Sequence, residues 1–339
     1  MSDELRIGIA GLGRLGARHA RMLRSRIPRA SLVAACSPVA DERAWAKREL
    51  GLNEVYATYD ELLAHREIDA VVLVTPTSEH AHQIVEALEA GKHVFSEKPT
   101  SLNLQDCLAV EAGAQRHPER KVLIGYVRRF DPSYRDAFDT IARGGIGVPF
   151  LVRSHTLDKN DPSGFFVRFA PTSGGIFLDM SVHDIDAARW FLGGPKPVRV
   201  FATGTVAVHE GLKAIGDLDN GMALCEFEGG KIACLQASRT MAHGHESMTE
   251  VIGTDGRISI GANPWLNRVG IADAQGVRNE CTPTFYERFE EAFAAELTAF
   301  VASVLDDAAL PLTLHDATEA TRIGIAIQES IRSKRAVDL

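Results

Sequence analysis

The chain has 339 residues, more than a single hydrophobic core usually serves, so two domains are expected. Hydrophobic residues make up 45% of the sequence, as in an ordinary globular protein, and the formal net charge is −8. Because no block of lysine or arginine offsets this acidity, neither nucleic acid nor an anionic membrane surface is an expected partner.

The start of the sequence and its cysteines favour a cytoplasmic protein. Residues 1–4 are polar or acidic and lead at once into an apolar segment, without a basic-then-apolar leader. No apolar run is long enough to cross a bilayer, so no membrane association is expected. The five cysteines are scattered, contain no CxxC pair and are expected to be reduced thiols: Cys36, Cys107, Cys225, Cys234 and Cys281.

Residues 5–16, LRIGIAGLGRLG, read as a short apolar strand, a glycine turn and the start of a helix. Gly11 permits the tight turn, Gly13 lets the backbone approach a pyrophosphate, and Gly16 allows the helix to lie close on the strand. The amides at the start of this helix favour an anion. This is a dinucleotide-binding fingerprint, and its expected cofactor contacts are Gly11, Leu12, Gly13, Arg14, Leu15 and Gly16.

The second strand is expected at residues 30–37, and its end is where such folds read the adenine ribose. An Asp or Glu normally stands there to bind the 2′-hydroxyl of NAD, but here the sequence is CSP. Ser37 can donate to a ribose hydroxyl, and no arginine follows immediately to neutralise a 2′-phosphate. NAD is therefore the expected cofactor, and NADP is left open because Asp41, Glu42 and Arg43 lie just beyond.

Two further loops are expected at the carboxyl edge of the sheet, where ligands bind in open α/β folds. The loop TPTSEH follows an apolar strand at residues 70–74, and EKP follows a strand at residues 93–96. The cofactor contacts expected from these loops are Thr75, Pro76, His80, Glu97 and Lys98. His80 and His82 diverge on a helix, which argues against a shared metal, and no metal site is expected.

The motifs GxGxxG, TPTxxH and EKP, in this order and spacing, resemble those of the Gfo/Idh/MocA family of sugar and polyol dehydrogenases. Two later segments agree with this resemblance. GYVRRFDP at residues 125–132 resembles the family's opening of the second domain, and SGGIFLDMSVHDID at residues 173–186 resembles its catalytic helix. Within the family, the residues of these segments are most similar to those of inositol 2-dehydrogenases.

The expected fold class is α/β. A Rossmann dinucleotide-binding domain over residues 1–124 precedes an α+β substrate domain over residues 125–339 with a large, mainly antiparallel open sheet. The strands predicted for that sheet lie at residues 150–156, 198–208, 221–227, 231–240 and 249–252. Amphipathic helices are predicted at residues 285–305 and from residue 315 onwards, and the last could pack back on the first domain. The resemblance implies a homo-oligomer, a tetramer or dimer, formed through the open sheet.

Taking a hydride from a secondary alcohol requires nicotinamide over the C–H bond, a base for the hydroxyl proton and charge support for the oxygen. Asp179 and His183 are four residues apart and, with Asp186, are expected to share one helix face. An imidazole titrates near neutrality, which suits His183 to the general base. Asp179 can anchor a hydroxyl, and Lys98 can hold the reacting oxygen. The resemblance gives Lys98, Asp179 and His183 the family's catalytic roles.

Each catalytic candidate has a structural alternative. An Asp and a His at this spacing often form a simple helix pair or supply two metal ligands, and a lysine before a proline can be a solvated loop residue. A zinc centre would need a further ligand cluster, which the sequence lacks. Besides the catalytic candidates, the residues expected to bind substrate hydroxyls are Arg128, His155, Asp158 and Asn160.

The motifs and the resemblance together predict an NAD-dependent inositol 2-dehydrogenase that oxidises myo- or scyllo-inositol to a ketone. The nearest alternative is a dehydrogenase of the same mechanism that acts on an aldose or another pyranose. A non-catalytic dinucleotide sensor would keep the glycine turn but has no use for Lys98, Asp179 and His183 together. Their joint presence argues against a sensor.

Overall fold

The computed structural model describes residues 3–339, and these form two compact units. The first unit contains the chain up to Phe130 together with Glu291–Glu319, and the second contains Asp131–Glu290 and Ala320–Leu339. The chain is therefore not divided at a single point near residue 125, because the late segment Glu291–Glu319 belongs to the first unit.

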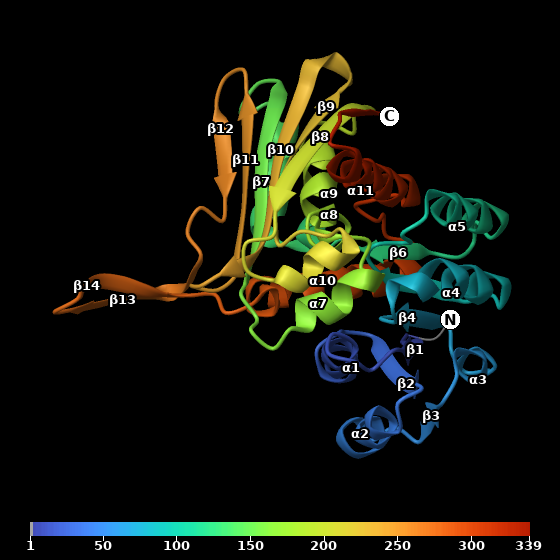
Figure 1. Ribbon diagram of the computed structural model, residues 1–339. Helices are drawn as coiled ribbons and strands as arrows, with labels where there is room; N and C mark the ends of the chain where they lie inside the picture. Colours follow the sequence, from blue (N-terminus) through green and yellow to red (C-terminus); the bar gives the residue numbers. More distant parts are fainter. Residues whose placement is uncertain (1–2) are drawn as a thin grey trace. The chain divides into compact units, whose positions relative to one another are not determined.

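A six-stranded parallel sheet forms the centre of the first unit (Figure 1). Its strand order is β3-β2-β1-β4-β5-β6, the doubly wound order of dinucleotide-binding folds, which confirms the predicted fold class. The carboxyl ends of these strands meet at one edge, as the sequence analysis required. The strands are β1 (Leu5–Ala10), β2 (Ala30–Cys36), β3 (Glu54–Tyr56), β4 (Ala70–Leu73), β5 (His93–Glu97) and β6 (Val122–Gly125).

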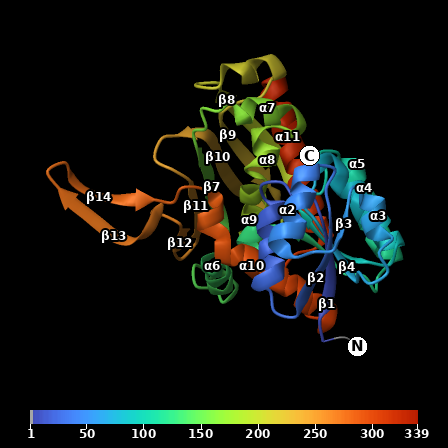
Figure 2. The same ribbon diagram turned by 90° about the horizontal axis from the view of Figure 1, so that it is seen from below.

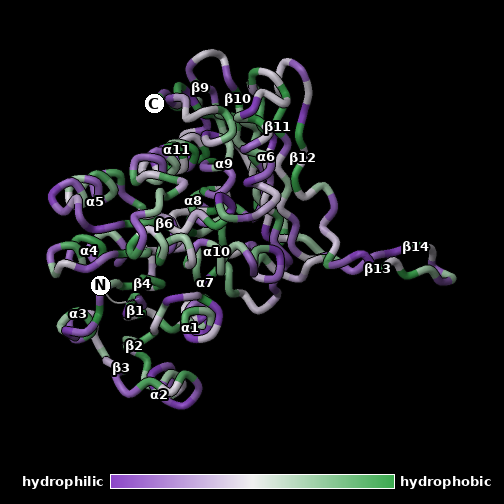
Figure 3. Tube along the Cα trace, turned by 180° about the vertical axis from the view of Figure 1, so that it is seen from behind, coloured by the Kyte–Doolittle hydropathy of each residue, from purple (hydrophilic) through white to green (hydrophobic). Residues whose placement is uncertain are grey.

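Helices flank this parallel sheet on both sides (Figure 2). Every residue of β4 is buried, as expected for a strand covered on both faces. The tube of α4 and α5 alternates between hydrophilic and hydrophobic colours in Figure 3, because each helix turns one face to the sheet. The helices are α1 (Gly16–Ser25), α2 (Ala40–Leu50), α3 (Tyr59–Leu63), α4 (Thr77–Glu89) and α5 (Leu104–Arg116), followed by the 3₁₀ turn η1 (Val127–Phe130).

Local capping signals set several of these helix boundaries. Thr58 and Glu61 form a reciprocal capping box at the start of α3. The Asn103 side chain accepts a hydrogen bond from the Gln105 amide, 2.8 Å long, at the start of α5. Gly51, with φ of +66°, ends α2 in the left-handed conformation that glycine adopts without strain.

The second unit is built on a mixed seven-stranded sheet with the order β12-β11-β7-β10-β9-β8-β15. Its neighbours pair antiparallel except for β7 and β10, which are parallel, so the predicted antiparallel character holds for most of the sheet. The strands are β7 (Pro149–Lys159), β8 (Pro197–Thr205), β9 (Asn220–Phe227), β10 (Lys231–Met241), β11 (Glu246–Gly253), β12 (Arg257–Ile260) and β15 (Val337–Asp338).

A two-stranded hairpin extends from this unit, away from its main sheet (Figure 1). It consists of β13 (Trp265–Asp273) and β14 (Gly276–Cys281), which the sequence analysis did not predict. Its residues are mostly exposed, so the hairpin lacks the apolar alternation by which a half-buried strand is recognised.

Helices cover one face of the mixed sheet. Helix α8 (Ile176–Asp179) contacts β9 and β10, and α9 (Val182–Phe191) contacts β7 and β10. The remaining helices of this part of the chain are α6 (Pro132–Ala142), α7 (Phe165–Phe169), α10 (Phe285–Leu305) and α11 (Leu314–Ser333). The last two pass from one unit to the other, and α10 has non-helical dihedral angles at Phe289, just before its crossing.

The predicted single helix carrying Asp179, His183 and Asp186 is wrong. Asp179 ends α8, Met180 and Ser181 form a turn, and His183 lies in the first turn of α9. Ser181 has φ of −80° and ψ of 0°, which departs from α-helical geometry and allows the chain to change direction. The spacing of Asp179, His183 and Asp186 is the same as in one continuous helix, so the sequence pattern did not reveal the break.

Candidate active site

The chain leaves β1 in a turn that requires glycine at two positions. Gly11 has φ of +87°, and a Cβ there would lie 2.4 Å from the Val74 carbonyl oxygen. A Cβ at Gly16 would lie 2.0 Å from the Gly11 carbonyl oxygen. A Cβ at Gly13 would have no atom within 3.9 Å, where the first neighbour is Glu42 Oε1. The turn is thus tight where the strand and helix meet and open where a pyrophosphate must approach, so these residues fit a dinucleotide.

Ser37, at the end of β2, is buried and fully engaged with α2. Its hydroxyl donates to Glu42 Oε2 at 2.5 Å and accepts from the Val39 amide at 3.1 Å. The Arg43 guanidinium donates to the Ser37 carbonyl oxygen at 2.7 Å. Ser37 therefore holds the start of α2, and its hydroxyl binds the carboxylate of Glu42.

His80 joins the two loops at the carboxyl edge of the sheet. Its ring is buried, with Nε2 2.8 Å from the Thr75 carbonyl oxygen and Nδ1 2.9 Å from that of Pro99. Burial lowers the pKa of His80, although both carbonyl groups favour its charged form. Because both ring nitrogens face backbone carbonyl oxygens, His80 fixes the loops that carry Thr75 and Lys98.

Three ionisable side chains meet in the interior of the first unit. His19, Glu97 and Glu296 are buried, and their ligand atoms lie within 4.8 Å of one another. Among residues 3–339 this is the one such group that could hold a metal ion. His19 Nε2 lies 2.8 Å from Glu97 Oε1, whereas neither carboxylate oxygen of Glu296 has a hydrogen-bond partner.

The position of Glu296 favours a proton over a negative charge. Burial, and then the neighbouring charge of Glu97, raise the pKa of Glu296 well above its usual range. A neutral Glu296 leaves Glu97 as the acid that faces His19. The other oxygen of Glu97 accepts a hydrogen bond from the backbone N–H of Lys98 at 3.3 Å, so this cluster adjoins the backbone of the predicted catalytic lysine.

In the second unit, a fully buried arginine on β10 holds Asp179. Arg239 Nη2 donates to Asp179 Oδ2 at 2.7 Å, and Nη1 lies 3.5 Å from Asp217 Oδ2. Asp217 in turn accepts the Ile176 amide at 3.0 Å, so the network connects both ends of α8. The guanidinium also lies 5.2 Å from the centre of the Phe166 ring. Asp179 keeps 23% of its side chain exposed, as a substrate contact requires.

The acidic residues that follow His183 are buried in the unit. Asp184 accepts hydrogen bonds from Ser154 at 2.6 Å and from Thr156 at 2.7 Å, which fastens α9 to β7. Asp186 is 1% exposed. His183 is partly exposed, unlike these two residues, and is the member of the segment accessible to a ligand.

Strand β7 places the predicted substrate residues on different faces of its sheet. Ser154 and Thr156 face the helices, so alternation puts Asp158 on that face and His155 on the other. His155 pairs there with Glu246, 2.9 Å away. Asp158 lies 2.8 Å from His245 Nδ1, so His245 holds one of the substrate candidates. The structure therefore does not bring His155 together with Asp158.

Two other substrate candidates lie in different surroundings. The backbone N–H of Asn160 donates to the Met241 carbonyl oxygen at 2.8 Å, which places Asn160 just beyond the paired ends of β7 and β10. Arg128 lies in η1 of the first unit and is 2% exposed. Asn160 thus follows Asp158 at the end of the strand, while Arg128 belongs to the unit that carries the glycine turn.

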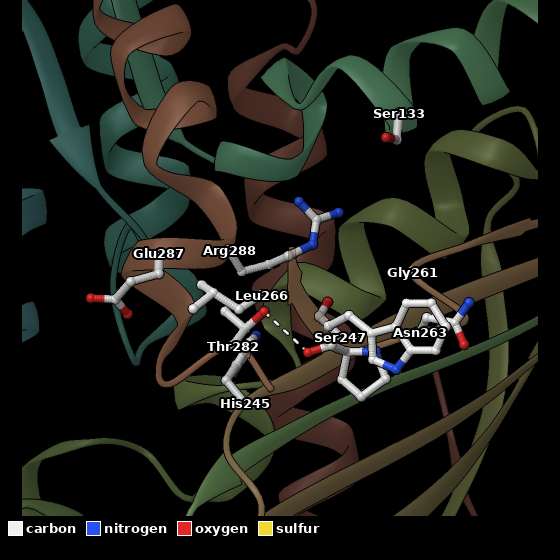
Figure 4. Close-up of a pocket in the computed structure, with 11 residues that line it drawn as sticks. Ser133, His245, Ser247, Gly261, Asn263, Leu266, Thr282, Glu287 and Arg288 are labelled. Carbon is white, nitrogen blue, oxygen red and sulfur yellow. Dashed lines mark hydrogen bonds between the residues drawn. The ribbon is translucent and has the colours of Figure 1, made fainter. Parts of the chain in front are cut away.

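A cavity of about 330 Å³ opens in the second unit, and Figure 4 shows its lining. His245, Ser247 and Arg288 are part of that lining, together with Trp265 from the hairpin. His245 Nε2 and Ser247 Oγ are buried atoms without a hydrogen-bond partner. The cavity therefore presents unsatisfied polar groups beside an aromatic ring, and His245 connects it to Asp158.

Comparison with known proteins agrees with both halves of this geometry. Residues 5–126 match the family described as "Oxidoreductase family, NAD-binding Rossmann fold", and residues 134–259 match the "GFO/IDH/MocA C-terminal domain". The chain belongs to the Gfo/Idh/MocA family. Membership confirms the resemblance seen in the motifs and makes this chain an NAD-binding oxidoreductase.

Three relatives illustrate how far the similarity of this Gfo/Idh/MocA member extends. Scyllo-inositol 2-dehydrogenase (NAD⁺) of Bacillus subtilis is 37% identical over 100% of this chain and 97% of its own. A crystal structure of scyllo-inositol dehydrogenase from Lactobacillus casei, with bound NAD(H) and scyllo-inositol, is 40% identical with a TM-score of 0.95 and covers 99% of each chain. Myo-inositol 2-dehydrogenase of Lactobacillus plantarum is 37% identical, with a TM-score of 0.95 and 99% of each chain covered.

Sequence reasoning missed three residues that support the site of this family member: Arg239, Asp217 and His245. Arg239 had a usable signal, because alternation along the apolar strand from Lys231 places it on the buried face with Leu235 and Ala237. A charge at such a position needs a buried partner. Asp217 and His245 lie in irregular segments, where burial does not follow a helix or strand periodicity that the sequence could show.

Proposed function

We propose that this chain is an NAD-dependent inositol 2-dehydrogenase that oxidises scyllo- or myo-inositol to a ketone. The observation that carries the proposal is the pairing of Asp179 with buried Arg239. His183 follows four residues later and is partly exposed, and the other unit carries Lys98 and an open glycine turn. Full-length similarity to scyllo- and myo-inositol dehydrogenases supports this choice of substrate.

Each catalytic candidate has a distinct role in the proposed reaction. His183 removes the hydroxyl proton, because an imidazole exchanges protons near neutral pH. Asp179, oriented by Arg239, accepts a hydrogen bond from a substrate hydroxyl and fixes the ring. Lys98 donates to the reacting oxygen and stabilises the negative charge that develops on it. NAD, when bound, supplies the hydride acceptor.

The glycine turn and the carboxyl-edge loops hold the cofactor in this proposal. Gly13 offers the open backbone for the pyrophosphate, and Thr75 and Pro76 border the site on the next strand. His80 contributes by fixing those loops, since both of its ring nitrogens face carbonyl oxygens. Further contacts are assigned to Gly11, Leu12, Arg14, Leu15, Gly16 and Lys98. Ser37 and Glu97, which the sequence also offered as contacts, are buried, and their side chains are already bonded to Glu42 and His19.

The hydroxyls of the ring away from the reacting carbon need additional hydrogen-bond partners. Asp158 and Asn160 are proposed for this purpose, because Asp158 is on the helix-covered face of β7 and Asn160 follows at the strand end. Arg128 is proposed as a donor from the first unit. His155 is left out, because it pairs with Glu246 on the opposite face.

A substrate panel tests the proposal directly. Myo-inositol, scyllo-inositol, glucose and other pyranoses are each offered with NAD and with NADP, and the absorbance of reduced nicotinamide is followed. The expected result is the highest kcat/KM with an inositol and NAD. A higher value with a pyranose would redirect the proposal to the aldose alternative, and binding of NADH without turnover of any polyol would favour the sensor.

The open face of the second unit's sheet supports a homo-oligomer, a tetramer or dimer. Phe201, Leu224 and Cys234 are cross-strand neighbours on this face, and Phe201 and Leu224 are 46% and 39% exposed. Met222, on the same strand as Leu224, is 58% exposed. An exposed apolar sheet face of this kind fits a second copy of the chain. A monomer mass by light scattering at assay concentration would refute the assembly.

The cytoplasm is the proposed compartment. All five cysteines are free thiols, and burial raises the pKa of Cys36 and Cys225 to about 12. Among residues 3–339, no helix is both long and apolar enough to span a lipid bilayer.

A further inference from the structure

The strand that normally supplies a ribose-binding acid does not supply one here. In dinucleotide folds an Asp or Glu near the end of the second strand accepts a hydrogen bond from the 2′-hydroxyl of NAD. Strand β2 ends at Cys36, and Ser37 follows with its hydroxyl already engaged. The matched family is described as NAD-binding, and Ser37 itself offers no carboxylate for the ribose.

Glu42, in the first turn of α2, brings a carboxylate to the same place. Its Oε2 accepts the Ser37 hydroxyl at 2.5 Å, which ties the side chain to the end of β2. Its Oε1 is the nearest atom to the position of a Cβ on Gly13, 3.9 Å away. The carboxylate therefore lies between the end of β2 and the glycine turn, and it is partly exposed.

We propose that Glu42 selects NAD over NADP, in place of the missing acid on β2, and that Ser37 positions it. The carboxylate accepts the ribose 2′-hydroxyl of NAD. It repels the 2′-phosphate of NADP, since like charges brought together lower affinity. The inference deepens the proposed function at its cofactor and depends on NAD binding, not on the identity of the polyol.

The cations nearby explain why a carboxylate is needed for this choice. Arg43 donates to the Ser37 carbonyl oxygen at 2.7 Å, and Arg14 is exposed in the glycine turn. Both are on segments that border Glu42, and arginine is the residue that best binds a phosphate. The Glu42 carboxylate offsets part of this positive charge. Without it, these cations favour the 2′-phosphate.

The test is a titration of the full-length protein with NADH and NADPH, followed by nicotinamide fluorescence. Glu42→Gln keeps the shape of the side chain and removes its charge. The ratio of the Kd for NADPH to the Kd for NADH is expected to fall at least about tenfold. Asp41→Asn is the matched control, because it removes the same charge from an exposed neighbour on the same helix and should leave the ratio unchanged.

Ser37→Ala is a second variant that separates positioning from charge. It keeps Glu42 but removes the hydroxyl that holds it, so the ratio should fall in the same direction by a smaller factor. Equal weakening of both dinucleotides in Glu42→Gln, or a shift no larger than in Asp41→Asn, would overturn the proposal. No polyol is present in the titration, so a wrong substrate assignment would leave this result intact.

Discussion

Arg239 Nη2 lies 2.7 Å from the carboxylate of Asp179, and the arginine itself has no exposed surface. A guanidinium with no access to water must be compensated by protein groups, and Asp179 and Asp217 are those groups. Burial raises the pKa of Asp217 even though Arg239 acts in the opposite direction. The arrangement fixes the orientation of Asp179 from inside the sheet.

Replacement of Arg239 is therefore expected to damage both stability and turnover. Arg239→Met leaves the buried carboxylate of Asp217 and the partly exposed carboxylate of Asp179 without their cation, and breaking a buried ion pair typically costs about 3–5 kcal/mol. Urea unfolding measures this loss, and kcat measures the misorientation of Asp179. Arg199→Met is the control, because Arg199 is an exposed sheet arginine that pairs with Glu226 and should tolerate the change. Equal stability of the two variants would contradict the role of Arg239.

His183→Ala tests the general base. A positioned base contributes about a hundred- to ten-thousandfold, so kcat should fall by at least about a hundredfold. The Kd for NADH should be nearly unchanged, because the glycine turn belongs to the other unit. In the wild-type enzyme, kcat/KM for oxidation should rise with pH as the imidazole loses its proton, and this rise should disappear in the variant. Retention of both turnover and the rise would assign the base to Lys98 or water.

His80→Phe tests whether the carboxyl-edge loops need their shared imidazole. The variant fills the space but removes the ring N–H, which a neutral imidazole donates to one of the Thr75 and Pro99 carbonyl groups at a time, a loss of about 1–3 kcal/mol in stability. Looser loops should also weaken NADH binding. His82→Ala, at a ring that is 71% exposed on the same helix, should change neither quantity. A His80→Phe variant with unchanged urea unfolding and Kd would refute the prediction.

Glu296→Gln tests the protonated carboxyl group. Because burial raises the pKa of Glu296 in the folded protein, folding favours the protonated form, and stability from this group is lost as pH rises from the unfolded pKa through the folded one. Glutamine cannot ionise, so the variant should match the wild type at acidic pH and be more stable at neutral and higher pH. Urea unfolding across this range measures the difference.

Two controls complete the Glu296 experiment. Glu291→Gln changes an exposed residue of the same helix, which pairs with Arg26, and should show no such pH dependence. Elemental analysis of the purified protein addresses the alternative that His19, Glu97 and Glu296 hold a divalent cation. A stoichiometric metal together with destabilisation by Glu296→Gln would overturn the assignment of a proton.

Much of the first unit could be predicted from local sequence. Apolar runs such as residues 70–73 identified the buried strands, and the glycines identified the turn because Gly11 and Gly16 leave no space for a Cβ. The second unit was predicted less completely. The parallel pairing of β7 and β10 and the exposed hairpin β13–β14 depend on partners distant in sequence or on no partner at all.

The catalytic candidates could be predicted from sequence, whereas the local geometry that positions them could not. Lys98, Asp179 and His183 stand in short motifs, so the sequence pointed to them. The break between Asp179 and His183 did not appear in any motif, because a turn at Met180 and Ser181 preserves the residue spacing while it ends one helix and begins the next.

The sequence by itself determined the family, the dinucleotide turn and the residue types available for catalysis, because each depends on short local motifs that can be recognised without the fold. Only the tertiary structure decided which buried charge holds Asp179, which face His155 occupies and which carboxylate stands at the end of β2. Those relationships join Arg239 to a helix sixty residues earlier and bring Glu42 toward Gly13. They follow from burial and long-range packing, which one sequence without its fold does not specify.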